Sequence, residues 1–225
     1  MPRSMMPSEQ RKETAVAVAL REQLRHVFWI GGGSGAGKST LGHRLATEHG
    51  LLLYKTDDVM AEHSRRITLE ICPFLQEFIA MDMDERWLNR SPATMFETFH
   101  WFRGEGFNLI IEDLLRLPTA RGVIAEGLRL LPHLVKPLLS ASHHAVWLLP
   151  TPEFRQAAIE QRGGWAFLAK TSNPERAFQN LLERDRMFTD RLRAEVERLQ
   201  LRAIEVSSTT TEDASAYLLA KMFGL

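Results

Sequence analysis

The stretch Gly32-Gly33-Ser34-Gly35-Ala36-Gly37-Lys38-Ser39 matches the pattern G-x-x-x-x-G-K-[ST] at every required position. The apolar run Val27–Ile30 precedes it, and a helical pattern from about Ser39 to Glu48 follows it. This is the strand–loop–helix context that the motif needs. Glycines let successive backbone N–H groups turn inward, and the positive end of the following helix points at the same place. The stretch therefore predicts a phosphate-binding loop.

The residues of this loop have different expected roles. Lys38 would place a mobile positive charge at the β- and γ-phosphates of a nucleotide, and the Ser39 hydroxyl would ligate Mg²⁺. ATP and Mg²⁺ are therefore the expected cofactors. The predicted nucleotide-binding residues are Gly32, Gly33, Ser34, Gly35, Ala36, Gly37, Lys38, Ser39 and Thr40. Ser34 and Thr40 either touch phosphate or satisfy backbone groups of the loop and helix. A glycine-rich turn with a surface lysine is the structural alternative, and the flanking elements argue against it.

Strand and helix patterns alternate along most of the chain. Besides the first run, short apolar runs that predict strands occupy residues 51–55, 123–125, 145–149 and 202–206. Helical stretches lie between them. This alternation predicts a three-layer α/β/α fold with a mostly five-stranded parallel sheet, in a single domain over residues 1–225.

Two segments depart from the alternation. Residues 60–118 have helical periodicity and many aromatic side chains, and Ser91-Pro92 is typical of a helix start. We interpret them as a helical insertion that covers the strand ends and binds substrate. Residues 162–173 contain the pair Gly163-Gly164 and are expected to form a mobile lid.

Acidic side chains follow two of the predicted strands. Asp57 and Asp58 come after the second strand, and Glu126 ends the third. Ligands of parallel sheets bind beyond the carboxyl ends of the strands. We expect Asp57 to be the catalytic group that orients an acceptor hydroxyl, with Asp58 and Glu126 also binding substrate and Glu126 helping to hold the metal. The structural alternatives are a helix N-cap for one aspartate and a solvent-exposed acid for Glu126.

Arginine is the residue type expected to offset charge on a transferred phosphoryl group. Arg162 is the predicted catalytic lid arginine, and Arg155 is a weaker candidate. Arg184 and Arg191 are seven residues apart and share a helix face, although most charges on such a helix are solvated.

Within the insertion, polar residues stand among the aromatic ones. Arg103 is a candidate contact to an anionic substrate. His100 is interpreted as a satisfied structural histidine, because that is the commoner role of a lone histidine.

The amino-acid composition limits the kinds of partner that are expected. Lys+Arg and Asp+Glu both total 28, so the net charge is formally zero, and neither nucleic acid nor an anionic membrane is the expected partner. The one cysteine cannot form an intramolecular disulfide, and no apolar run is long enough to span a bilayer. These features predict a cytoplasmic protein. The chain is expected to be a monomer or a homodimer.

The segments GGGSGAGKST at Gly31–Thr40, TDD at Thr56–Asp58 and VIAEG at Val123–Gly127 resemble the P-loop kinase superfamily, with an element order similar to shikimate, gluconate and nucleoside monophosphate kinases. The resemblance implies that Asp57 binds the substrate hydroxyl, that Arg162 touches the ATP phosphates, and that Ser207–Thr211 lies near adenine.

The expected function is that of an ATP-dependent kinase transferring the γ-phosphoryl group to a small-molecule acceptor. The alternative is a nucleotide-dependent regulatory ATPase or switch, whose aromatic insertion would contact a protein partner.

Overall fold

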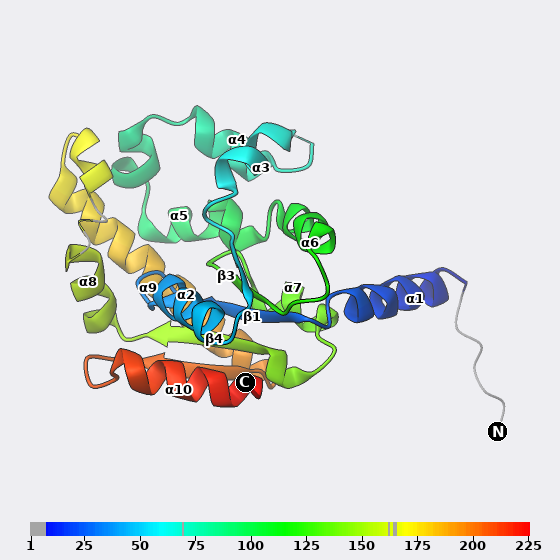
Figure 1. The fold of residues 1–225 in the computed structure, drawn as a ribbon. Coiled ribbons are helices and arrows are strands. Elements are labelled where there is room, and N and C mark those ends of the chain that lie inside the picture. The colour runs from blue at the N-terminus through cyan, green and yellow to red at the C-terminus, as the bar shows by residue number, and fades with distance from the viewer. Residues whose placement is uncertain (1–7, 69, 162, 164–165) are drawn as a thin grey trace, which may run out of the picture.

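The computed structural model describes residues 8–68, 70–161, 163 and 166–225 (Figure 1). Within them the chain begins with helix α1 (Ser8–Gln23), which projects from the body of the molecule. No helix in these ranges is long and apolar enough to cross a bilayer.

A parallel sheet of five strands lies at the centre. The strands are β1 (Val27–Gly32), β2 (Leu52–Lys55), β3 (Val123–Glu126), β4 (Ala145–Pro150) and β5 (Arg202–Val206). Their order is β2-β3-β1-β4-β5, and every neighbouring pair is parallel. Ile30 of β1 and Lys55 of β2 both pair with Glu126 of β3, so the carboxyl ends of these three strands meet at one place. All five strands predicted from the sequence are confirmed, with bounds that shift by at most two residues.

Helices cover both faces of the sheet, which confirms the three layers. On one face, α2 (Lys38–Glu48) and α10 (Glu212–Phe223) bury Leu41, Leu45 and Leu219 against Ile30 and Ile124. The other face packs against α9 (Pro174–Arg198) and the residues 60–118. Helix α8 (Pro152–Gln161) follows β4, and the short elements α7 (Pro132–Val135), η3 (Lys136–Leu138), η4 (Ser142–His144) and η5 (Ala166–Lys170) complete the described chain.

The residues 60–118 are helical, as the periodicity predicts. They form α3 (Met60–Arg66), α4 (Pro73–Ala80), the π-helical turn η1 (Glu85–Asn89), α5 (Pro92–Thr98), the 3-10 turn η2 (His100–Arg103) and α6 (Phe107–Arg116). Figure 1 shows α3 and α4 standing above the sheet, and α3 is the element that follows β2 in the chain. The predicted cap at Ser91 is confirmed, because its hydroxyl accepts a hydrogen bond from the Thr94 N–H at 3.1 Å.

Helix α9 ties these residues to the sheet. It begins after Asn173, whose side chain accepts from the Arg176 N–H at 3.0 Å. Its apolar stripe packs into the core, with Phe188 wholly buried. The Phe188 ring stacks on Phe102 of η2 with ring centroids 3.8 Å apart and planes 5° from parallel. This contact fixes the position of the insertion over the carboxyl ends of the strands.

Candidate functional site

The phosphate-binding loop runs from the end of β1 to the start of α2. Gly32 has φ 134°, and Gly35 and Gly37 have φ 74° and 79°. These are backbone conformations that glycine adopts without a Cβ clash. A Cβ on Gly32 would also lie 2.1 Å from the Leu148 carbonyl oxygen on β4. The local fold therefore requires glycine here for backbone reasons, independently of any ligand.

Lys38 is the first residue of α2, and its Nζ donates to the Gly33 carbonyl at 2.8 Å. The side chain thus lies back across the loop. No acidic residue occupies the first turn of α2. The positive end of the helix dipole is therefore not neutralised from within its own first turn. A loop with inward-turning glycines, a lysine across it and a helix start without acidic residues of its own can bind phosphate.

Glu126 is buried at the end of β3, with 1% of its surface exposed. Burial raises the pKa of this carboxyl group, while the charge of Lys38 and the hydroxyl of Ser39 act in the opposite direction. Its Oε1 has no hydrogen-bond partner among the residues that the structure describes. Glu126 is therefore not the solvent-exposed strand-end acid of the structural alternative. The carboxylate and the Ser39 hydroxyl supply the oxygen ligands that Mg²⁺ prefers, and the unpaired oxygen fits a metal there.

The two aspartates after β2 are exposed. Asp58 pairs with Lys55 at 3.3 Å, and the negative charge of Asp57 acts on both Glu126 and Arg129. Asp57 thus lies near the end of β3, as expected. The capping role considered for one of the pair is wrong: Val59 is the N-cap of α3, and within the described chain no side-chain hydrogen bond caps that helix.

Gly127 holds the ends of β2 and β3 together. Its φ is 154°, and a Cβ there would lie 1.7 Å from the Thr56 Oγ1. Thr56 is fully buried and its N–H donates to the Glu126 carbonyl at 3.0 Å. The segments that carry Asp57 and Glu126 are therefore locked against each other.

A buried polar network, not anticipated from the sequence, lies beside these acids. Arg129 is 3% exposed, and its guanidinium bonds to His63 Nδ1 at 3.1 Å and to the Gly106 carbonyl at 3.0 Å. His63 Nε2 in turn lies 2.7 Å from Asp113 Oδ2, which also accepts from the Tyr54 hydroxyl at 2.9 Å. Since Arg129 can only donate, His63 must accept at Nδ1 and donate from Nε2. The only signal in the sequence is the position of Arg129 three residues after Glu126.

Charge and burial act together on this network. Burial pushes the pKa of Asp113 up, but the hydrogen bonds from His63 and Tyr54 outweigh it, so the pKa lies below its usual value. Burial lowers the pKa of the Arg129 guanidinium. Glu62, His63 and Asp113 also bring three possible metal-ligand atoms within 4.8 Å of one another. Arg129 already occupies one side of His63, and Arg66 lies 3.6 Å from Asp113, so the surrounding cations oppose a metal ion.

The arginines singled out from the sequence differ in their burial and in their contacts. Arg162 lies outside the described residues. Arg155 is not a lid residue: it is 2% exposed within α8, and its Nη1 donates to Thr189 Oγ1 on α9 at 3.3 Å. Arg103 is exposed over the Phe74 ring at 5.1 Å.

Arg184 and Arg191 share the face of α9 that packs against the insertion. Arg184 is 5% exposed, lies 4.4 Å from the centroid of the Phe99 ring and bonds to Asp185 at 2.6 Å. Arg191 donates to the Phe102 carbonyl. Neither belongs to a solvated face, because both guanidinium groups stack on aromatic rings of the insertion.

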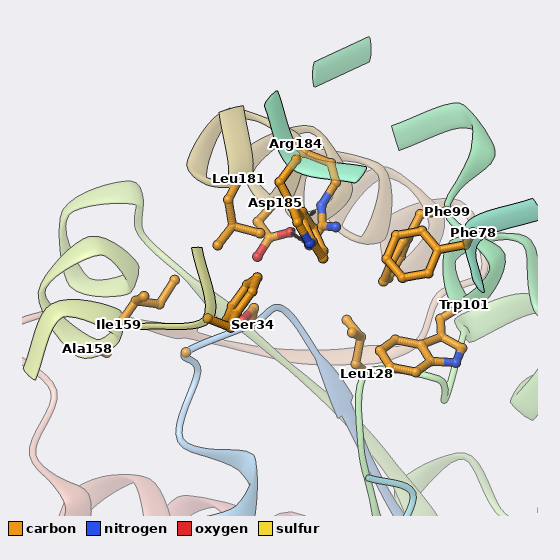
Figure 2. A pocket seen from close by; sticks show the side chains of 13 residues that line it. Ser34, Phe78, Phe99, Trp101, Leu128, Ala158, Ile159, Leu181, Arg184 and Asp185 are labelled. Carbon is orange, nitrogen blue, oxygen red and sulfur yellow. Dashed lines mark hydrogen bonds and ion pairs between the residues drawn. The ribbon is translucent and has the colours of Figure 1, made fainter. Parts of the chain in front are cut away.

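A cavity of about 400 Å³ opens beside the start of the loop. We call it the ring cavity, because five of its lining residues are aromatic. Its lining residues are Ser34, Gly35, Phe78, Trp87, Phe99, Trp101, Leu128, Ala158, Ile159, Phe167, Leu181, Arg184 and Asp185. Figure 2 shows Arg184 and Asp185 reaching from α9 toward Ser34, with Phe78, Phe99 and Trp101 on one side and Ala158 and Ile159 on the other.

A second cavity of about 210 Å³ lies at the other end of the loop, and we call it the β5 cavity. Its lining residues are Ala36, Gly37, Thr40, Leu41, Phe154, Val206, Thr210, Glu212 and Ser215. Thr210 belongs to the segment that the family resemblance places near adenine. The loop therefore separates two cavities, and phosphates bound on it would lie between them.

His100 is buried but is not a satisfied structural residue. It is 2% exposed and contacts the rings of Phe78, Phe99 and Trp101. Neither ring nitrogen has a hydrogen-bond partner in the described chain. Burial, together with the charges of Arg129 and Arg184, lowers its pKa to about 3, so the ring is neutral at physiological pH.

A loop of this kind after the central β1, in a parallel sheet of order β2-β3-β1-β4-β5, defines a P-loop fold of the kinase-like type. No family model matches the chain, and no curated protein matches it.

Solved structures with a similar fold include two kinases. Deoxyadenosine kinase from M. mycoides, with bound dATP, is 12% identical with a TM-score of 0.48, over 88% of this chain and 100% of that one. Shikimate kinase from Bacteroides thetaiotaomicron is 15% identical with a TM-score of 0.38, over 88% and 98%. An uncharacterized protein from Eubacterium ventriosum is 13% identical with a TM-score of 0.47, over 88% and 97%. Likenesses at this level say nothing about the substrate.

Proposed function

We propose that the protein is an ATP- and Mg²⁺-dependent kinase that transfers the γ-phosphoryl group to a small-molecule acceptor. One observation carries the proposal: the phosphate-binding loop lies between two separate cavities, and buried Glu126 and nearby Asp57 stand where the strands end. A phosphoryl transfer enzyme needs a nucleotide site, an acceptor site and an acid between them.

In this proposal the β5 cavity takes the base of ATP, and the loop residues from Gly32 to Thr40 hold its phosphates. Lys38 neutralises charge on the β- and γ-phosphates, and Arg162 assists from the lid. Ser39 and Glu126 hold Mg²⁺, which offsets the charge of the phosphate oxygens when bound. The ring cavity takes the acceptor.

Asp57 is the proposed catalytic carboxylate. It is exposed at the end of β2, its charge is felt by Glu126, and it can therefore accept a hydrogen bond from an acceptor hydroxyl in front of the phosphates. Asp58 is the less suitable of the two, because it is paired with Lys55. Arg103 is exposed and does not line the ring cavity, so its contact to an anionic substrate stays a prediction.

The test separates binding from transfer. Lys38→Ala is expected to weaken MgATP binding in calorimetry. Asp57→Asn is expected to leave MgATP affinity within about twofold of wild type and to lower acceptor-dependent ADP release by at least about 100-fold. Asp190→Asn, which removes an exposed carboxylate bonded to Arg186 on α9, is the matched control and should change neither. If no sugar, hydroxy acid, nucleoside or nucleotide stimulates ADP release, the kinase assignment is wrong.

A regulatory ATPase is the second candidate, and one observation favours it. Ile71 and Ile79 of the insertion are 59% and 49% exposed, as they would be on a surface that meets a protein partner. Slow hydrolysis with no acceptor stimulation, and a partner captured only in the ATP state, would support it.

A further inference from the structure

The ring cavity has the walls of a site for one class of acceptor. Resting on the proposed function, we infer that the acceptor is an uncharged alcohol carrying a flat aromatic or heteroaromatic ring, which inserts among the side chains of the insertion and α9. The cavity volume of about 400 Å³ falls within the range of small-molecule sites, about 300–1,000 Å³.

The shape and chemistry of the walls support a flat ring. The aromatic lining residues come from four separate segments: Phe78 from α4, Trp87 from η1, Phe99 and Trp101 beside and within η2, and Phe167 from η5. Neighbouring rings stand edge to face, as in the Phe78–Trp87 and Phe99–Trp101 pairs, both at 81°. Such walls offer both faces and edges to an inserted ring, the arrangements that aromatic pairs prefer.

The charges of the walls cancel. Among the described lining residues the only charged ones are Arg184 and Asp185, which are bonded to each other at 2.6 Å. The guanidinium group of Arg184 also packs against the Phe99 ring, so that ring already covers one of its faces. A phosphate or carboxylate on the acceptor would lose its hydration without gaining an uncompensated cation. The cavity therefore favours an uncharged ring over its anionic derivatives.

One polar group of the walls lacks a partner. Arg184 Nη1 is buried without a hydrogen bond to any described residue. A ring nitrogen or carbonyl oxygen entering beside it would supply the missing acceptor, because guanidinium N–H groups only donate. This feature favours a heteroaromatic ring with an acceptor on its edge over a plain hydrocarbon ring.

The position of the cavity directs the hydroxyl of such an acceptor. Ser34 and Gly35 of the phosphate-binding loop form one wall, and Leu128, two residues after Glu126, forms another (Figure 2). A ring held among the aromatic side chains therefore leaves its alcohol group facing the loop. Transfer breaks the bond between the γ-phosphorus and the bridging oxygen of ATP, forms a bond to the acceptor oxygen, and releases ADP and the hydroxyl proton.

The test is calorimetry on the full chain without nucleotide, using three sets of probes. Adenosine, cytidine and pyridoxine represent flat-ring alcohols, AMP and CMP their charged counterparts, and shikimate and gluconate non-aromatic hydroxy acids. At least one flat-ring alcohol is expected to bind with Kd below about 1 mM, and at least about tenfold more tightly than AMP, CMP and the hydroxy acids.

Two variants locate the binding. Trp101→Ala and Phe167→Ala, both of residues that keep some exposure, should each weaken that binding about tenfold while MgATP affinity stays within about twofold. Tyr217→Ala, an aromatic residue 71% exposed on α10, is the control and should change nothing.

Failure of the inference differs from failure of the proposed function. The inference is overturned if no flat-ring alcohol binds, if the charged or non-aromatic probes bind more tightly, or if both cavity variants bind like wild type. If instead a flat-ring alcohol binds as expected but MgATP does not bind or no ADP is released, the ring site stands and the kinase assignment falls.

Discussion

Removing one ring from the Phe102–Phe188 stack should cost both stability and the placement of the insertion. Phe188 is 0% exposed and Phe102 is 2% exposed, with ring centroids 3.8 Å apart. Truncating a buried phenylalanine to alanine typically costs about 3–5 kcal/mol, which combines lost burial with the cavity left behind. As residues in direct contact, the two rings are expected to share a coupling energy of about 1 kcal/mol. We therefore expect Phe188→Ala to lower the free energy of unfolding by about 4 kcal/mol.

Equilibrium urea unfolding measures this loss, and a double-mutant cycle with Phe102→Ala isolates the pairwise part. The losses of unfolding free energy in the two single variants should sum to about 1 kcal/mol more than the loss in the double variant, because the contact can be lost only once. Trp101 of the ring cavity is the neighbour of Phe102 in η2. Phe188→Ala should therefore weaken acceptor binding. If Phe188→Ala lowers the free energy of unfolding by less than about 1 kcal/mol, the reasoning is refuted, because a change that small is typical of exposed positions.

Three further predictions concern the carboxyl groups of Glu126 and Asp113 and the glycine that holds the ends of β2 and β3 together, Gly127. Burial raises the pKa of Glu126, so its contribution to stability is present in acid and lost as the pH rises through that raised pKa. Without ligands, Glu126→Gln should therefore have a higher Tm than wild type near about pH 8, and the difference should shrink toward about pH 5; a difference independent of pH would contradict this. The pKa of Asp113 is lowered in the folded protein. Its contribution to stability is therefore present at pH values above the usual carboxyl pKa, and it is lost as the pH falls through the lowered pKa. Asp113→Asn should cost about 2 kcal/mol in urea unfolding at neutral pH and less in acid, because its hydrogen bonds to His63 and Tyr54 lose the charged acceptor. Gly127→Ala should cost about 3 kcal/mol in urea unfolding, because the new Cβ would meet Thr56 Oγ1 at 1.7 Å in a strained backbone. Gly50 has φ 63°, but no described group lies within 4 Å of its Cβ position, so Gly50→Ala should cost only about 1 kcal/mol. Equal losses in the two variants would show that the contact with Thr56 is relieved.

The site was only partly foreseeable from local sequence. The loop and Glu126 follow directly from the strand–loop–helix pattern and the acid at a strand end. Arg129 and His63 are 66 residues apart, and nothing in either neighbourhood indicates that they bond. Likewise, the rings around Arg184 come from segments about 90 residues away along the chain, so the burial of its charge cannot be inferred from the helix that carries it.

By itself the sequence determined the alternation of strands and helices, the helix cap at Ser91 and the phosphate-binding loop, because each depends on neighbouring residues and on backbone conformation. The tertiary structure alone decided which polar side chains lost contact with water. It buried His100 without a hydrogen-bond partner among the described residues, left both aspartates after β2 exposed, and closed the aromatic residues of the insertion around a cavity beside the loop. Burial and the unpaired groups it creates depend on segments distant in the chain meeting in space, and no local pattern encodes that meeting.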